Sequence, residues 1–311
     1  MISLLVSLAA LIVGYFVYGM VTEKIFAFDS RFIYYLIFRG YEMNLNQSIP
    51  LTSLRNAREI GGYCTADGRK VKRGVLLRTA NLRDISDDDK RKLSESYNLQ
   101  YLIDFRLPME IADAIDPEIH GAEYHHLDVI DMSAFVSDDI PDIDFTTLDL
   151  VGMTNLTLQC GMYEDDMYIG FLMPDYGKKA FSSFFRLLLS ADSDRAVLWH
   201  CTGGKDRTGV AAMLLLSALG VDEEVIIEDY MLTNKYNAEQ IEKTRQYLKS
   251  KGCDDEFISK GILVFDAVDE VIMRTAIDYL KAEYGSVVGY IRDELNISNE
   301  EINSLKEKYL L

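Results

Sequence analysis

Basic residues are scarce in this chain. Its 311 residues include 32 lysines and arginines against 50 aspartates and glutamates, which gives a formal net charge of -18 at pH 7. This imbalance argues against nucleic acid or a strongly anionic membrane surface as a general partner, because both attract positive charge. Any anionic substrate must therefore be bound by a local cluster of basic groups.

Cysteine is also rare, and the spacing of the cysteines is not that of a metal site or a disulfide framework. The four cysteines are widely separated and include no Cys-x-x-Cys pair, so neither a zinc site nor paired disulfides are predicted. Unpaired cysteines fit a reducing compartment best. The four are Cys64, Cys160, Cys201 and Cys253.

Histidine occurs only four times, and three of the four lie close together at His120, His125 and His126. Acidic residues surround them, which makes a metal site the alternative to consider. The alternation of apolar and polar residues over 123–129 instead favours the edge of a β-strand. We therefore expect no metal, and the chemistry described below needs no cofactor.

Long hydrophobic runs are absent except at the start of the chain. Residues 2–22 carry no charge and are long enough to cross a bilayer as one helix. No basic residue precedes this run, so an anchor is favoured over a cleaved signal peptide. Basic residues follow at Lys24, Arg31 and Arg39, which places the C-terminal side of the run in the cytoplasm by the positive-inside rule.

Three alternatives to this anchor stay open: secretion after signal cleavage, a buried helix, and a helix on the membrane surface. Residues 23–50 are rich in aromatic side chains and are interpreted as a connector. From residue 51 onward the chain alternates short apolar runs with amphipathic segments. Its 49% hydrophobic content is ample for a sizeable core.

The stretch that points to chemistry is His-Cys-Thr-Gly-Gly-Lys-Asp-Arg-Thr-Gly, residues 200–209. An apolar run, 196–199, precedes it, and an apolar segment, 210–219, follows it and ends before Gly220. A strand, a polar loop and a helix in this order aim backbone N–H groups at an anion. The pattern predicts a phosphate-binding loop.

Each residue type in this loop has a chemical reason to be there. Cys201 lies at a helix N-terminus near Lys205 and Arg207, so we expect a thiolate that acts as nucleophile. The planar fork of Arg207 suits two oxygens of a phosphoryl group. Asp206 is an unusual carboxylate in an anion site and is our candidate general acid.

The other loop residues are expected to shape the site. Gly203, Gly204 and Gly209 let the backbone approach the ligand, and Thr208 can donate a hydrogen bond to the sulfur. The predicted phosphate-binding set is Thr202, Gly203, Gly204, Lys205, Arg207 and Thr208.

The string His-Cys-x-x-Gly-Lys-Asp-Arg-Thr-Gly resembles that of the bacterial tyrosine phosphatases, a cysteine-dependent family that acts on phosphotyrosine and, in several members, on phosphoinositides. Two upstream segments resemble it too: the Asn-x-Arg-x-x-Gly-Gly run at 56–62, with a hairpin and a strand to Arg78, and the Asp104-x-Arg106 pair.

The resemblance gives these upstream residues candidate roles. Arg78 is a candidate for substrate binding, with a surface arginine as the alternative. Asp104 could position Arg207 or orient water, or it could simply form an ion pair with Arg106.

Residues 131–177 hold ten acidic residues and no lysine or arginine. Large apolar side chains among them suggest packed amphipathic helices. The family places helical lid segments here, so we expect a lid, with a permanently packed insertion as the alternative. Asp165, Asp166 and Asp175 in this segment are rivals to Asp206 as general acid.

Together these patterns predict an α/β phosphatase domain over 51–311, with a central, mainly parallel sheet flanked by helices. Helices are expected after Ser86 and over 178–190, 210–219, 222–232, 237–249, 269–284 and 298–308. The predicted activity is hydrolysis of phosphotyrosine through a phosphocysteine; the alternatives are phosphoinositide hydrolysis, a rhodanese-like sulfurtransferase, and a phosphate-binding module without turnover.

Overall fold

The computed structural model describes residues 47–130, 148–161 and 163–311. A compact unit spans Gln47–Leu311. It begins four residues before the predicted domain start, because residues 47–50 are tied into it: the Gln47 side chain donates a hydrogen bond to the Gly61 carbonyl at 3.0 Å.

The predicted membrane helix at 2–22 and the connector as far as residue 46 lie outside the described residues. Within the described ranges, no helix combines the length and the apolar character that a membrane span requires.

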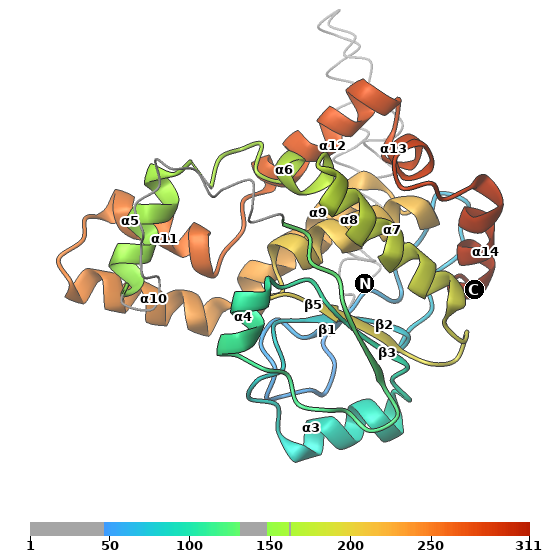
Figure 1. Cartoon of the computed structure of the whole chain (residues 1–311), viewed down its shortest axis with the longest axis horizontal. Helices are drawn as coiled ribbons and strands as arrows, with labels where there is room; N and C mark the ends of the chain where they lie inside the picture. The colour runs from blue at the N-terminus through green and yellow to red at the C-terminus, as the bar shows by residue number, and fades with distance from the viewer. Residues whose placement is uncertain (1–46, 131–147, 162) are drawn as a thin grey trace, which may run out of the picture. The chain divides into compact units, whose positions relative to one another are not determined.

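A five-stranded sheet organises the described residues (Figure 1), in the order β1-β2-β5-β3-β4. Only β1 runs antiparallel to its neighbour, so the prediction of a mainly parallel sheet is confirmed. Parallel strands place their carboxyl ends, and the loops that follow, at one edge. The strands are β1 Arg58–Glu59, β2 Leu76–Thr79, β3 Tyr101–Asp104, β4 Glu123–His126 and β5 Val197–His200.

Successive side chains of the inner strands face opposite sides of the sheet, as the pleat requires. In β5, Trp199 joins the main core and lies 5.4 Å from Phe184, centroid to centroid, whereas Leu198 joins a smaller core with Leu93. Figure 1 shows α3 below the sheet and α7, α8 and α9 above it. Both faces are covered, so every residue of β2, β3 and β5 is buried.

Helix α8 (Asp206–Leu219) lies at the centre of the main core, with twelve of its fourteen residues buried. It packs against α7, α9, α13 and α14. Gly220 ends it in the left-handed conformation, with φ 88°. The prediction of a buried central helix that stops at Gly220 is confirmed.

The predicted helices after Ser86 and over 178–190, 222–232, 237–249, 269–284 and 298–308 are all present, whereas α4 and α11 were not predicted. Side chains of Ser86, Asp222, Asp269 and Ser298 each accept a backbone N–H of the first turn. The bounds are α3 Asp87–Arg91, continued by the π-helical turn η1 Lys92–Ser96, then α4 Pro108–Asp113, α5 Leu150–Gln159, α6 Ile169–Leu172, α7 Asp175–Ser190, α9 Glu223–Tyr236, α10 Ala238–Ser250, α11 Asp255–Phe265, α12 Glu270–Tyr284, α13 Val287–Asp293 and α14 Asn299–Tyr309.

The acidic insertion, as far as it is described, packs against two different cores. Helix α5 contacts α11 and borders a small apolar cluster that includes Leu248 and Ile258. Tyr168 and Leu172, by contrast, are completely buried in the main core. Residues 131–147 of the segment predicted as a lid lie outside the described part, and the mobility of the lid stays a prediction.

Truncation inside α8 tests this account of the core. Leu215 is completely buried, so Leu215→Ala should lower the free energy of unfolding by roughly 2–5 kcal/mol through lost burial and a cavity. Val271, in the first turn of α12, is 46% exposed, and Val271→Ala should stay within about 0.5 kcal/mol of the wild type. Urea unfolding of both variants measures the difference; equal losses would contradict the placement of α8.

Candidate active site

The loop between β5 and α8 forms a closed turn around Cys201. Strand β5 ends at His200, and α8 begins at Asp206. Cys201 is 2% exposed, at the base of the turn. The backbone N–H groups at the start of an α-helix have no partners within the helix, so they are available to an anion bound here.

The loop keeps its shape because buried donors take its carbonyl oxygens. The Gly204 carbonyl accepts hydrogen bonds from Asn56 Nδ2 at 2.8 Å and from Arg78 Nη2 at 3.0 Å. Gly204 has φ 63°, and a Cβ there would lie 2.3 Å from the Thr79 carbonyl oxygen. Only glycine can therefore occupy this position without moving the backbone.

One carboxylate, Asp229 on α9, holds the arginines behind the loop. It lies 3.3 Å from Arg58 and 2.8 Å from Arg78, and both arginines are completely buried. Burial raises the pKa of Asp229, but the two positive charges outweigh burial and lower it. Burial and repulsion from Arg58 lower the pKa of Arg78 to about 10. Arg78 is thus a buried support of the loop and not a surface arginine.

Arg207, in the first turn of α8, is held by a residue that the sequence analysis missed. Its Nη1 and Nη2 donate to the two carboxylate oxygens of Glu110 at 2.6 and 2.8 Å, and Nη1 also donates to the Phe105 carbonyl at 3.2 Å. Burial raises the pKa of Glu110, but the bonds and charge of Arg207 outweigh it and lower the pKa to about 2. This pair is ionised at every working pH.

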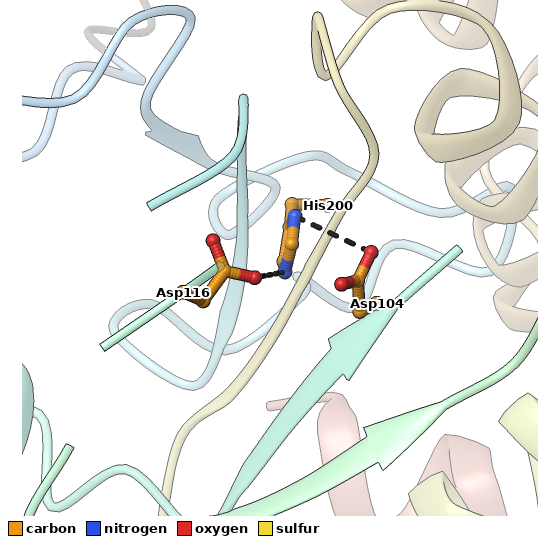
Figure 2. Close-up of side chains that lie close together, drawn as sticks. All are labelled: Asp104, Asp116 and His200. Atoms are coloured by element: carbon orange, nitrogen blue, oxygen red, sulfur yellow. Dashed lines mark ion pairs between the residues drawn. The ribbon is translucent and has the colours of Figure 1, made fainter. Parts of the chain in front are cut away.

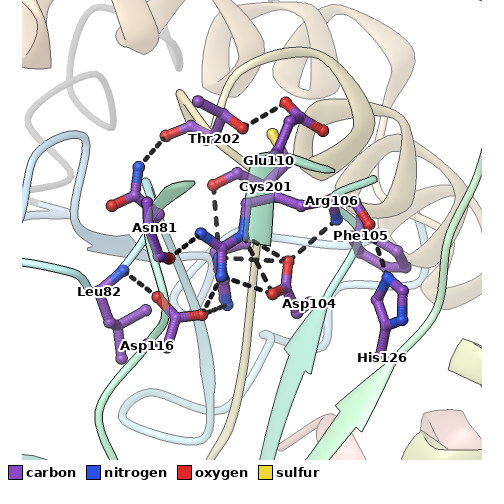
Figure 3. Close-up of polar contacts among 12 residues, drawn as sticks. Asn81, Leu82, Asp104, Phe105, Arg106, Glu110, Asp116, His126, Cys201 and Thr202 are labelled. Carbon is purple, nitrogen blue, oxygen red and sulfur yellow. Dashed lines mark hydrogen bonds and ion pairs between the residues drawn. The ribbon is translucent and has the colours of Figure 1, made fainter. Parts of the chain in front are cut away.

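The signal for Glu110 was present but weak. Helix α4 starts with Pro108, and the Glu110 carboxylate accepts the Leu107 N–H at 2.7 Å, which is the usual first-turn pattern of proline and glutamate. The Thr202 hydroxyl also donates to the Glu110 carboxylate, and the Thr202 carbonyl accepts from Asn81 Nδ2 at 3.0 Å (Figure 3).

Asp206 and Lys205 interact with each other. Lys205 Nζ lies 3.1 Å from an Asp206 carboxylate oxygen, and it donates to the carbonyls of Leu263 and Ala267 at 2.8 and 3.2 Å. The Lys205 side chain is 4% exposed, whereas that of Asp206 is 21% exposed. Asp206 therefore reaches the surface of the site, and the Lys205 amine is directed to the end of α11.

The remaining loop residues differ in what they contribute. A Cβ on Gly209 would lie 3.1 Å from the Tyr230 ring, whereas one on Gly203 would meet nothing closer than 3.7 Å. The Thr208 hydroxyl is buried and has no hydrogen-bond partner among the described residues. The bond to the Cys201 sulfur that we predicted for Thr208 is not formed in this structure.

Asp104 does not contact Arg207. Its carboxylate instead accepts from Arg106 Nε and Nη2, and Arg106 Nη2 also binds Asp116. His200 lies between the two carboxylates (Figure 2), 3.1 Å from Asp116 and 3.8 Å from Asp104. These three residues are close enough to hold a metal ion. The buried guanidinium of Arg106 already pairs with both carboxylates, so the cluster is a buried ion-pair network.

The three rival acids make no polar contact with the loop among the described residues. Asp165, Asp166 and Asp175 are exposed and have no hydrogen bond or ion pair to residues 201–208 among the described residues. The geometry thus brings Cys201, Asp206 and Arg207 together on one loop, supported by Asn56 and Arg78 from behind.

A nucleophilic cysteine, a turn of backbone N–H groups and an arginine at the helix start are the parts of a cysteine-dependent phosphatase site. The chain belongs to the tyrosine phosphatase family, whose model matches residues 49–311. It is accordingly an enzyme of the protein-tyrosine phosphatase class, and both the resemblance and the predicted activity are confirmed at this level.

Three curated proteins are similar over most of the chain. One from Cupriavidus necator, provisionally named a tyrosine-protein phosphatase, is 31% identical over 262 residues, 84% of this chain and 88% of that protein. The triple specificity protein phosphatase PtpB of Mycobacterium tuberculosis is 25% identical over 271 residues, which are 81% of this chain and 95% of that protein. A tyrosine-protein phosphatase of Nostoc commune is 27% identical over 241 residues, which are 75% of this chain and 73% of that protein.

Two glycines with positive φ give a matched test of the loop. Gly204→Ala should lower the free energy of unfolding by more than about 3 kcal/mol, because left-handed strain adds to a clash with the backbone of Thr79. Gly68 has φ 89° with open space around it, so Gly68→Ala should cost only about 1 kcal/mol. Chemical denaturation separates the two; equal costs would contradict the close approach.

The buried carboxylate of Asp104 predicts a dependence of stability on pH. Burial raises its pKa, but the electrostatic attraction of His200 and the bonds from Arg106 outweigh burial and lower the pKa to about 2. A carboxyl group whose pKa is lowered by folding stabilises the fold at pH values above its ordinary pKa of about 4. This stability is lost as the pH falls toward 2.

We expect Asp104 to contribute roughly 2 kcal/mol to this loss in acid. Urea unfolding at pH 6 and pH 3 should show a smaller difference for Asp104→Asn than for the wild type. The same pH difference in both proteins would contradict the assignment.

Proposed function

We propose that this enzyme hydrolyses phosphotyrosine in proteins through a covalent phosphocysteine at Cys201. The observation that carries the proposal is that two N–H groups of the Arg207 guanidinium remain available for a ligand. Glu110 takes one hydrogen of each terminal nitrogen and the Phe105 carbonyl takes another, so Nε–H and one Nη2–H have no partner among the described residues. These two donors are parallel and match two oxygens of a phosphoryl group.

In the first step the Cys201 sulfur attacks phosphorus, the S–P bond forms, and the P–O bond to the leaving tyrosine breaks. The Arg207 donors and the loop N–H groups bind the equatorial oxygens, where charge accumulates in the transition state. Asp206 gives its proton to the leaving oxygen. Its partial exposure, beside a buried cysteine, supports this role.

In the second step water attacks the phosphocysteine. The O–P bond forms, the S–P bond breaks, and the thiolate leaves while the Asp206 carboxylate takes a proton from the water. Arg207 and Arg78 both keep their positive charge: the bonds and charge of Glu110 outweigh burial and raise the pKa of Arg207, and burial lowers that of Arg78 only to about 10. No cofactor takes part in either step.

Phosphotyrosine stands first as substrate because the family is one of tyrosine phosphatases. A phosphoinositide is the second candidate, and the name of the M. tuberculosis relative, a triple specificity phosphatase, supports a broader substrate range. The idea that Lys205 binds a second phosphate has less support, since the buried amine already donates to Leu263 and Ala267. In this scheme residues 51–311 are the catalytic domain, 131–177 its lid, and 2–22 a single-pass anchor with the domain in the cytoplasm.

Turnover of two substrates tests this function. The full chain should hydrolyse a phosphotyrosine peptide in a vanadate-sensitive reaction faster than a short-chain phosphatidylinositol phosphate. Cys201→Ser should lose all measurable activity, and Asp206→Asn should lose roughly 10²- to 10⁴-fold in kcat, the usual contribution of a general acid and base.

Faster hydrolysis of the lipid would transfer the substrate assignment to phosphoinositides. Turnover that survives in Cys201→Ser would overturn the phosphocysteine route altogether.

A further inference from the structure

A buried tyrosine from the acidic insertion contacts the proposed general acid. The Tyr168 hydroxyl donates a hydrogen bond to Asp206 Oδ1 at 2.7 Å and lies 2.7 Å from the Tyr230 hydroxyl. Tyr168 is completely buried, and Tyr230 is 1% exposed. No part of the mechanism above uses either tyrosine, yet together they form a buried chain of hydroxyl groups that ends at Asp206.

The direction of this chain follows from counting protons. Burial and the Asp206 charge raise the pKa of both tyrosines well above the ordinary value, so both hydroxyls keep their protons. A hydroxyl has one hydrogen, and that of Tyr168 is used on Asp206. Tyr230 must therefore donate to Tyr168, which polarises the Tyr168 hydroxyl and strengthens its bond to the carboxylate.

The geometry also limits where Asp206 can carry its proton. Oδ1 accepts from Tyr168 at 2.7 Å and from Lys205 Nζ at 3.3 Å. Oδ2 lies 3.1 Å from Lys205 Nζ and accepts from no hydroxyl among the described residues, so the transferable proton belongs on Oδ2. A carboxyl group pinned at one oxygen loses its freedom to rotate, and its second oxygen points in a fixed direction. A fixed orientation of the donor group increases the rate of proton transfer to a bound substrate by a large factor.

We propose that Tyr168 is a positioning residue that fixes the Asp206 carboxyl for proton transfer through Oδ2, so that the insertion supplies part of the catalytic apparatus. This inference rests on the proposed role of Asp206 as general acid. In the first step the proton moves from Asp206 Oδ2 to the leaving oxygen as the P–O bond breaks, and Tyr168 keeps its own proton throughout.

The packing around Tyr168 makes removal of its hydroxyl a clean test. Its ring stacks on Phe171 with centroids 5.6 Å apart, and Tyr168→Phe retains this contact. Tyr290 offers a matched control: it is completely buried, and its hydroxyl donates at 2.6 Å to the carbonyl of Leu172, the last residue of the helix α6 that begins directly after Tyr168. Tyr290→Phe thus removes an equally buried hydroxyl that does not contact Asp206.

The experiment measures kcat/KM of the full chain on two aryl phosphates. Phenyl phosphate has a poor leaving group that needs an acid, whereas 2,4-dinitrophenyl phosphate leaves without one. Tyr168→Phe should lose about tenfold on phenyl phosphate, the equivalent of one charge-assisted hydrogen bond, and less than about twofold on the dinitrophenyl ester. Tyr290→Phe should change both rates by the same small factor.

Two further measurements separate positioning from structural damage. Competitive inhibition by inorganic phosphate should be unchanged in Tyr168→Phe, because the anion site is intact. Adding Tyr168→Phe to Asp206→Asn should cost no further activity on phenyl phosphate within about twofold, since the hydroxyl acts only through the carboxyl.

Suppose that Asp206→Asn loses more kcat/KM on phenyl phosphate than on the dinitrophenyl ester, as a general acid should. The inference is then overturned if Tyr168→Phe loses the same factor on both esters. It is also overturned if the losses of Tyr168→Phe and Asp206→Asn multiply in the double variant. If Asp206→Asn shows no such dependence, the acid assignment itself fails, and this inference fails with it. Residual turnover in Cys201→Ser is a separate result that refutes the phosphocysteine route.

Discussion

A loop that turns its backbone N–H groups toward an anion must find donors for its carbonyl oxygens on the opposite side, and this constraint organises the described unit. Asn56 and Arg78 supply those donors to Gly204. Arg78 can remain buried because Asp229 neutralises it together with Arg58. Removing one partner would leave a buried charge uncompensated, so strands β1 and β2, helix α9 and the loop depend on one another.

The same principle explains how an acidic protein can bind a phosphoryl group. The chain carries a net charge of -18, but Arg78 and Arg207 interact electrostatically with Cys201, and each is held by a carboxylate, Asp229 or Glu110. Glu110 orients the Arg207 fork through two of its nitrogens and leaves two hydrogens available. Acidic residues elsewhere on the chain do not prevent binding, because interactions beyond about 10 Å are screened at physiological salt.

Local features of the sequence predicted most of the fold and the centre of the site. The 200–209 loop, the helices that begin after Asp222, Asp269 and Ser298, and the stop at Gly220 depend on neighbouring residues, and each is found where expected. Glu110, Asp229 and Tyr168 were missed because their partners are distant in the chain: Glu110 is 97 residues from Arg207 and Asp229 is 151 from Arg78. Asp229 lies on the apolar face of an amphipathic helix, three residues after Ile226, and a charged residue on that face was the available signal.

The central claim is that phosphorus becomes bonded to Cys201 during turnover, and mass spectrometry of acid-quenched enzyme tests it most directly. Wild-type protein mixed with excess aryl phosphate and quenched within one turnover should carry one phosphoryl group on the peptide that contains Cys201, and Cys201→Ser should carry none. Product formation at the normal rate with an unmodified cysteine would contradict the account.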